Sequence, residues 1–249
     1  MTPGALIALL AIGLLVGALI GAVGVGGVLL VPALVLVGGL EVAAATPVAT
    51  MSFFFTGVAG TIAYQRACRI DWSSTQWLVW AAVPGAIAGA LANIALPGPV
   101  ITLIVAAMLG VAALQALRGI PPDRTGRRAL SVAALLAIGL VVGFGSTLSG
   151  TGGPVLLIPV LLIAGTATTL AVSSSQPIQI PIAVFGTASF LLYGALDWKL
   201  AIAVGLAQGV GTVIGARLSS RLPIVTLRTL VGWALALSGV IFIVRAMGG

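Results

Sequence analysis

The sequence contains no histidine, a single cysteine and only four acidic residues among 249 positions. Without histidine, and without a cluster of cysteines or carboxylates, it lacks the side chains that commonly bind transition metals or relay protons. The lone Cys68 excludes an internal disulfide, and no nucleotide-binding loop or nucleophile–base pair is present. These absences argue against an enzyme, a metal site and a bound cofactor.

Charge is scarce as well. Charged residues make up 6% of the chain and hydrophobic residues 60%, and the mean hydropathy is +1.28. A soluble domain normally carries about 25% charged residues, and each helical bilayer crossing needs roughly 20 apolar residues. Nearly the whole chain consists of such stretches, so we expect an all-α, multi-pass membrane protein. The first stretch lacks a basic leader, which favours a membrane helix over a cleaved signal peptide.

The net charge of +7 comes from 11 basic residues. In a soluble protein this excess could indicate nucleic-acid binding. Here the basic residues fall in the short connections between apolar stretches, where they act as an orientation signal. We therefore expect a lipid bilayer as the partner of this chain and no nucleic acid.

The chain repeats itself at a spacing of 126 residues. The matching features are GVGG at 24–27 and GTGG at 150–153, DW at 71–72 and 197–198, and the glycine pairs Gly85/Gly89 and Gly211/Gly215. Internal self-similarity of this kind indicates two copies of one structural unit. We assign residues 1–120 to a first transmembrane repeat, 129–249 to a second, and the polar stretch PPDRTGRR, 121–128, to a cytoplasmic linker.

Each repeat holds five hydrophobic segments. They span about 4–23, 28–39, 42–65, 72–95 and 99–118 in the first repeat, and 129–149, 154–165, 168–194, 198–220 and 225–246 in the second. The second segment of each set has only 12 residues, about 18 Å of helix against a hydrocarbon core of about 30 Å. We expect these segments to be short or broken helices at the glycine-rich motifs, and they could also be re-entrant.

The basic residues test the orientation of the two repeats. If every segment crosses, nine lysines and arginines fall on one side of the membrane and two on the other. If the short segments are re-entrant, the split is eight to three. The positive-inside rule favours the first model, which makes the second repeat inverted and places both termini outside. Inverted repeats recur in secondary transporters, whose sites lie where broken helices of both halves meet.

The glycine-rich breaks are the first candidate binding site. A helix start presents unpaired N–H groups and a positive dipole end, and glycine lets a ligand approach the backbone. The candidate anion-binding residues are Gly24, Gly26 and Gly27 in the first repeat and Gly150, Thr151, Gly152 and Gly153 in the second. The alternative is tight helix packing, which small residues also permit, and which we favour for Gly85, Gly89, Gly211 and Gly215.

A polar cluster follows each short segment and forms the second candidate. It comprises Thr46, Thr50 and Ser52 in the first repeat and Ser174, Ser175, Gln176 and Gln179 in the second. Pro47 and Pro177 align, which predicts a kink in both third segments. Hydroxyls and amides could complete the hydrogen bonds of an oxyanion, or the hydroxyls could bond to their own helix.

The acidic residues all lie near segment ends. Asp71 and Asp197 precede segments that begin with tryptophan, which predicts helix N-caps beside interfacial rings. No carboxylate at membrane depth offers an evident proton relay.

Several motifs resemble the paired glycine-rich signatures of the sulfite exporter TauE/SafE family, also called the toluene sulfonate uptake permease family. They are GAVGVGGVLLVPALVLVGG, GFGSTLSGTGGPVLLIPVLLIAG, ATPVATM, RIDW, GAIAGALA and VIGARLSSRLP. The resemblance implies a permease of the bacterial inner membrane for small sulfur oxyanions or organosulfonates. The family's run has a third glycine where Val28 and Pro154 stand here. Pro154 suits a first helical position but removes one N–H donor.

The resulting interpretation is a secondary transporter that moves a small sulfur-containing anion by alternating access, the anion being held at helix N-termini near the midplane. Export driven by membrane potential would need no proton site. Two alternatives stay open: a channel-like conduit for the same anions, and a membrane sulfur-relay protein using Cys68. Substrate, direction, coupling ion and oligomeric state are left open by the sequence.

Overall fold

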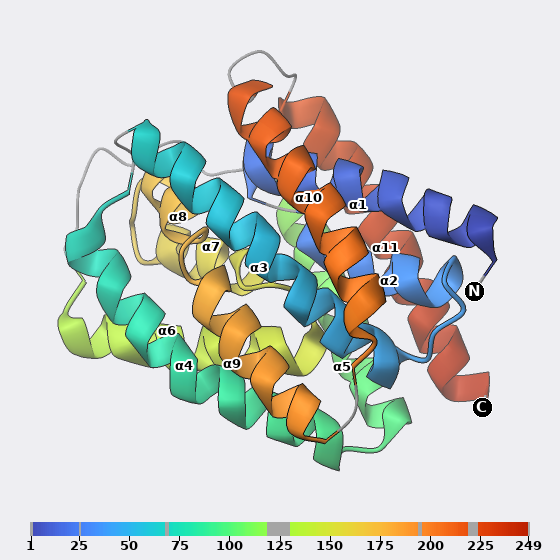
Figure 1. Ribbon diagram of the computed structural model, residues 1–249. Helices are drawn as coiled ribbons and strands as arrows, with labels where there is room; N and C mark the ends of the chain where they lie inside the picture. The colour runs from blue at the N-terminus through green and yellow to red at the C-terminus, as the bar shows by residue number, and fades with distance from the viewer. Residues whose placement is uncertain are drawn as a thin grey trace.

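The computed structural model describes residues 2–24, 26–67, 70–118, 130–193, 196–218 and 224–248. Throughout these ranges the regular structure is helical (Figure 1). The elements are α1 (Pro3–Val23), the 3₁₀ turn η1 (Gly27–Leu29), α2 (Leu30–Leu36), α3 (Val42–Arg66), α4 (Trp72–Ala95), α5 (Gly98–Arg118), α6 (Val132–Ser149), α7 (Pro154–Ile163), α8 (Thr168–Ser174), α9 (Gln179–Leu192), α10 (Trp198–Leu218) and α11 (Ile224–Gly248). Cys68 and the linker 121–128 lie outside the described residues.

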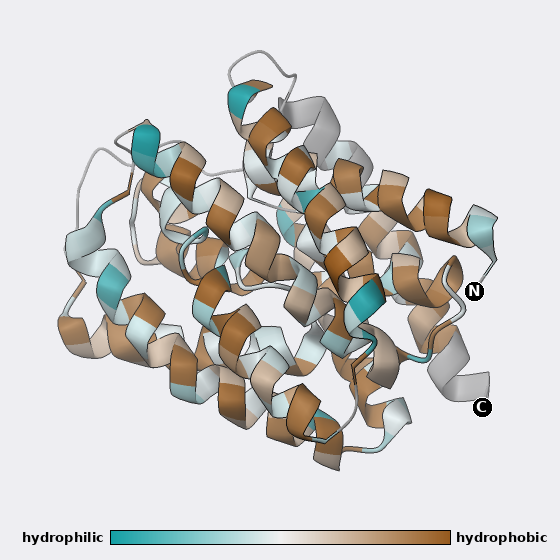
Figure 2. Cartoon of the chain, in the orientation of Figure 1, coloured by the Kyte–Doolittle hydropathy of each residue, from teal (hydrophilic) through white to brown (hydrophobic). Residues whose placement is uncertain are grey.

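Seven stretches of the described chain are long and apolar enough to cross a membrane. They are α1, α3, α4, α5, α6, α10 and the stretch Leu170–Leu192, which joins α8 and α9. Shorter apolar helices cover Gly27–Leu36, Pro154–Ile163 and Gly232–Val244. Most residues of the helices are hydrophobic, and hydrophilic residues lie mainly near the helix ends (Figure 2). The expected all-α membrane fold with short helices after the glycine motifs is therefore confirmed.

Two carboxylates cap helix starts as the sequence predicted. The Asp71 side chain accepts a hydrogen bond from the Ser73 amide at 3.1 Å, at the start of α4. Asp197 accepts one from the Leu200 amide at 3.1 Å, at the start of α10. Each carboxylate satisfies one of the N–H groups that a helix start leaves unpaired.

The two halves pack reciprocally. Helix α1 packs on α10, and α4 packs on α6, so the first helix of each half contacts the fourth helix of the other. The fifth helices, α5 and α11, pack on each other, and so do α3 and α9. Because the closest pairings join different halves, neither half forms a separate core.

Glycines set these cross-half interfaces, at matched positions. A Cβ atom at Gly85 would meet the carbonyl oxygen of Leu140, and one at Gly211 would meet that of Leu14. The next pair is equally matched, Gly89 with Phe144 and Gly215 with Ala18. Every partner in one interface is 126 positions from its counterpart in the other. The packing interpretation of these four glycines is confirmed.

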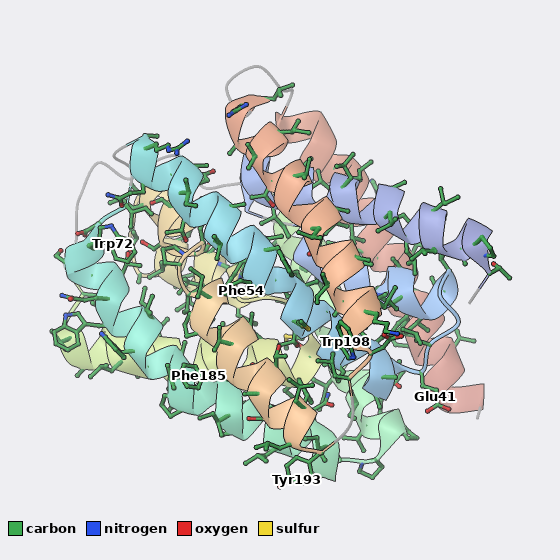
Figure 3. All side chains as sticks on the ribbon, viewed as in Figure 1. Glu41, Phe54, Trp72, Phe185, Tyr193 and Trp198 are labelled. Carbon is green, nitrogen blue, oxygen red and sulfur yellow. The ribbon has the colours of Figure 1, made fainter. Side chains whose placement is uncertain are left out.

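Corresponding helices run in opposite directions. Helices α3 and α9 lie side by side, and Figure 1 shows α3 running from the end near both termini to the far end, while α9 runs back. Trp72 and Trp198, which begin α4 and α10, lie toward opposite ends of the bundle (Figure 3). The inverted repeat itself stays a prediction.

The third segments of the two halves differ in continuity. Helix α3 continues through Pro47 as one helix of 25 residues. Its counterpart is interrupted by a turn at 175–178, around Pro177, and is divided into α8 and α9. We predicted a kink in both; helix α3 is continuous through Pro47, and the second half has a complete break at 175–178.

Candidate functional site

Each glycine-rich break begins with a left-handed glycine that ends the preceding long helix. Gly24 has φ +73° and Gly150 φ +67°, and their amides donate to the carbonyls of Ile20 and Ser146. This C-cap needs a positive φ, which glycine adopts without steric cost. The repeated glycine at this place is therefore a requirement of the backbone, whatever the site binds.

The second-half break continues with two more left-handed glycines. Gly152 has φ +82° and Gly153 φ +92°, and α7 starts at the next residue, Pro154. Among the described residues, the amides of Gly152 and Gly153 have no backbone acceptor. Two N–H groups and the positive end of the 10-residue α7 are thus presented at one point.

The two breaks converge on one aromatic ring. A Cβ atom at Gly27 would lie 2.9 Å from Cε1 of Phe53, and one at Gly152 would lie 2.8 Å from Cδ2 of the same ring. Phe53 is fully buried. The ring, contributed by α3, is therefore held between the break of the first half and the break of the second.

The breaks also contact the opposite halves reciprocally. Gly24 faces Val172 of α8, and Gly150 faces Thr46 of α3, the residue 126 positions earlier than Val172. The carbonyl of Thr151 lies 3.1 Å from a Cβ position at Gly27. The structure thus brings Gly24, Gly27 and the 150–153 motif into one region. Gly26 differs, because it faces Leu19 and the backbone of α1.

The surroundings of Gly152 and Gly153 differ from the arrangement we expected. The volume beside Gly152 holds the Phe53 ring, and Gly153 faces Ile178 and Ile182. An anion that reached these two amides would first have to displace apolar side chains. In this conformation the helix start is buried, and Cγ of Gln179 lies 3.9 Å from a Cβ position at Gly153.

Gln179 lies at the centre of the second polar cluster. Its Oε1 accepts a hydrogen bond from the Thr56 hydroxyl at 2.8 Å, which joins α9 to α3. Its Nε2 donates to the Ser175 carbonyl at 3.3 Å and to Oε1 of Gln176 at 3.2 Å. All four residues of this network are fully buried. The network spans the α8–α9 break and ties it to the first half.

Ser174 links this cluster to a cavity. Its Oγ accepts a hydrogen bond from the Thr75 hydroxyl at 2.9 Å, which leaves its own proton for another acceptor. Ser174 also lines a cavity of about 250 Å³ near the start of α4, together with Asp71 and Ser74. Ser174, the last residue of α8, therefore borders both this cavity and the turn that separates α8 from α9.

The hydroxyl groups of the first-half polar cluster donate their protons to backbone carbonyls of the same helix. Thr46 donates to the Val42 carbonyl at 2.9 Å, Thr50 to the Thr46 carbonyl at 2.9 Å, and Ser52 to the Ala49 carbonyl at 2.7 Å. A hydroxyl has one proton, so these groups cannot donate to an anion without first leaving their own helix. The geometry here matches the helix back-bonding alternative.

Two further hydroxyls of the candidate site also bond locally. Ser149 donates to the Gly145 carbonyl at 2.6 Å and lies 3.0 Å from the Thr151 hydroxyl. Because the Ser149 proton is used, Thr151 must be the donor of the second contact. Ser175 donates to the Val172 carbonyl at 2.7 Å.

Sequence reasoning missed several buried polar groups. Ser146, Thr147, Thr187 and Gln208 have side-chain atoms that are buried and have no hydrogen-bond partner in the described structure. Ser146 and Thr147 lie within the GSTLSG stretch, so its hydroxyl content was a usable signal. Phe53, Thr56 and Thr75 are apolar or isolated in the sequence, and nothing in it distinguishes them.

The candidate region contains donors but no charge. Every buried polar side chain of the described residues is a hydroxyl or an amide. Such a region can hold a small anion only through neutral donors and helix-end amides, because it lacks a lysine or arginine.

Comparisons with known proteins agree with this geometry. The family model for "Sulfite exporter TauE/SafE" matches residues 9–242. A probable membrane transporter protein, ORF9 of a Sinorhizobium species, is 26% identical over 200 residues, which cover 78% of this chain and 75% of that protein. The probable membrane transporter protein YunE of Bacillus subtilis is 28% identical over 98 residues, 36% of each chain. No solved structure matches. A chain with two glycine-rich breaks, multiple membrane-spanning helices and a family match over nearly its full length is a membrane transporter that belongs to the sulfite exporter TauE/SafE family.

Proposed function

We propose that this protein is a secondary transporter of small sulfur-containing anions, such as sulfite or organosulfonates, in the bacterial inner membrane. The observation that carries the proposal is the convergence of both glycine-rich breaks on Phe53, beside a buried network of uncharged donors. Broken backbone at membrane depth is tolerated where it is buried in protein or lines a cavity. A site at the meeting point of two repeats is the usual arrangement in secondary transporters.

Neutral hydrogen-bond donors suit a small oxyanion that a transporter must release after binding it. A sulfonate or sulfite group spreads its charge over three oxygens, each of which accepts hydrogen bonds. Helix-end amides, hydroxyls and carboxamides can satisfy these oxygens without the tight ion pair that a buried arginine would form. The candidate contacts are the amides of Gly152 and Gly153 and the side chains of Ser174, Gln176 and Gln179.

Alternating access is the mechanism that the packing supports best. The reciprocal interfaces α1–α10 and α4–α6 and the opposite directions of α3 and α9 support an inverted repeat. In our proposal the two halves exchange conformations, so that the site opens to one side and then to the other. Phe53, which occupies the space between the breaks, blocks the direct path in the present conformation.

Basic residues orient the protein in this proposal. Arg66 and Arg217 are exposed at the C-terminal ends of α3 and α10, which Figure 1 shows at the end away from the termini. By the positive-inside rule this end faces the cytoplasm, and both termini face outside. The cavity at Ser174 then opens from the cytoplasm. A negative interior potential favours anion exit, so we propose export.

Counterflow in proteoliposomes tests the proposal. Vesicles loaded with unlabelled sulfite should accumulate labelled sulfite transiently, and the rate should saturate with concentration. Gln179→Met should reduce this transport, because it removes the carboxamide that joins Thr56 to Gln176, whereas Gln76→Met on the exposed face of α4 should not. Saturation without counterflow would indicate a conduit, and loss of transport in Cys68→Ser would indicate a sulfur relay instead.

A further inference from the structure

Gln208 is a buried carboxamide at the middle of a membrane-spanning helix. It lies ten residues from each end of α10 and is 0% exposed. Neither its Nε2 nor its Oε1 has a hydrogen-bond partner in the described structure. Because both ends of the amide are unpaired, this holds whichever way the amide group is turned.

Such a group is costly and demands an explanation. Burying a polar group without a hydrogen-bond partner destabilises the folded protein. The lipid environment offers no water to offset this cost. Polar side chains at the centre of membrane helices are rare and usually mark a functional position.

Helix packing does not require the carboxamide. The residue 126 positions earlier is Ala82, in the matching α4–α6 interface. A Cβ at Gly143 would contact the Ala82 backbone, and a Cβ at Gly17 would contact the Gln208 backbone in the same manner. Both interfaces thus have the same close approach, and one of them achieves it with a methyl side chain.

Gln208 lies at the level of the candidate site. On α10, Gly205 faces the Cα of Ser52 at 3.1 Å, and Gly209 faces the Cβ of Phe55 at 3.3 Å, both measured from an ideal Cβ. Gln208 of α10 therefore lies at the same depth in the bundle as residues 52–56 of α3. These include Thr56, the hydrogen-bond partner of Gln179. Helix α10 also packs on α1, so Gln208 belongs to the central region where α1, α3 and α10 meet.

We propose that the Gln208 carboxamide binds the transported anion and selects anions that carry a hydrogen-bond donor. This inference rests on the proposed function and extends it to the substrate class. The NH₂ group donates to an oxyanion oxygen, and Oε1 accepts from an O–H or N–H of the same molecule. A fully deprotonated oxyanion without such a donor would leave Oε1 unpaired and facing negative charge. The favoured ligands are therefore monoprotonated oxyanions, such as hydrogen sulfite, and sulfonates with a hydroxyl or amino group.

A matched pair of sulfonates tests the selection. Ethanesulfonate and 2-hydroxyethanesulfonate differ by one hydroxyl, and their affinities can be measured by titration of the purified full-length protein. The wild type should bind the hydroxylated probe about tenfold to a hundredfold more tightly, because ethanesulfonate leaves the buried Oε1 without a donor. Sulfite, titrated below and above its second acid dissociation, provides an independent probe and should bind more tightly as the monoprotonated ion.

Gln208→Met separates binding from folding. Methionine keeps the length of the side chain and removes both polar ends, so the melting temperature should be unchanged or higher. The preference for the hydroxylated sulfonate and for hydrogen sulfite should disappear. Gln208→Ala, which reproduces the residue of the α4–α6 interface, should also lose the preference, although the cavity it leaves should lower the melting temperature. Gln76→Met on an exposed face should retain the wild-type preference.

The outcomes are distinct. If no probe binds the wild type, the proposed function fails and this inference fails with it. If the probes bind the wild type and both Gln208 variants equally, Gln208 is outside the site, although the protein still binds sulfur anions. A wild type that binds the two sulfonates equally and sulfite independently of its protonation overturns the donor selection. A clear fall in melting temperature in both variants assigns Gln208 a structural role.

Discussion

Gly211→Ala tests whether backbone contact between the two halves holds the protein together. The added methyl would point at the Leu14 carbonyl and the Ala18 amide of α1, in an interface that has no room for it. Alanine raises helix propensity by about 1 kcal/mol relative to glycine. We nevertheless expect a net loss of stability, because the methyl forces α1 and α10 apart.

The size of the loss follows from the contacts. Overpacking a tight interface costs about 1–3 kcal/mol. Separation of the helices also weakens the Cα–H···O contacts that such close approach permits, worth about 0.5–1 kcal/mol each. Against the gain in propensity, we expect net destabilisation of about 1–3 kcal/mol. Gly85→Ala should cost a similar amount, because it repeats the same clash with Leu140 in the α4–α6 interface.

A glycine with open surroundings provides the control. Gly110, inside α5, would place a Cβ with no atom within 4 Å. Gly110→Ala should therefore be neutral or stabilising by up to about 1 kcal/mol. Melting temperatures and reversible unfolding in mixed detergent micelles measure all three variants. If Gly211→Ala and Gly110→Ala shift stability in the same direction, close contact at Gly211 does not hold the halves together.

Three further results are expected. Phe53→Ala should cost about 3–5 kcal/mol by opening a cavity between the two breaks, and it should raise passive anion leakage from proteoliposomes; a stable variant without leakage would show that the ring blocks no path. Asp71→Ala and Asp197→Ala should each cost about 0.5–2 kcal/mol, measured by thermal unfolding, with transport intact, whereas normal folding with lost transport would contradict the capping role. Single-cysteine labelling on a Cys68→Ser background should find 121–128 inside and residue 249 outside, and a cytoplasmic residue 249 would contradict the inverted repeat.

The sequence predicted the helices well because apolar composition and helix-end signals are local. The DW pairs located two helix starts at Asp71 and Asp197, and the repeated glycine motifs located the breaks and short helices. The 126-residue spacing also indicated that Gly85 and Gly211 have equivalent roles. The spacing could not predict which residue each glycine contacts, because helix pairing across the halves depends on the fold as a whole.

The site was predicted less completely. Glycine and glutamine are conspicuous in an apolar chain, so the breaks, Gln176 and Gln179 could be found. Phe53 and Thr56 could not, because a phenylalanine or threonine in an apolar helix is unremarkable until its neighbours are known. The division at Pro177 was also unpredictable, since Pro47 occupies the aligned position and leaves α3 continuous.

The reciprocal pairing of α1 with α10 has a consequence for biogenesis. Helix α1 is synthesised well before its partner α10, which begins only at Trp198. Until then, the glycine-lined stripe on α1 must face lipid or another protein of the insertion machinery. This interface is therefore completed only after α10 has been inserted, and two separately expressed halves should reconstitute the protein only when they meet in the same membrane.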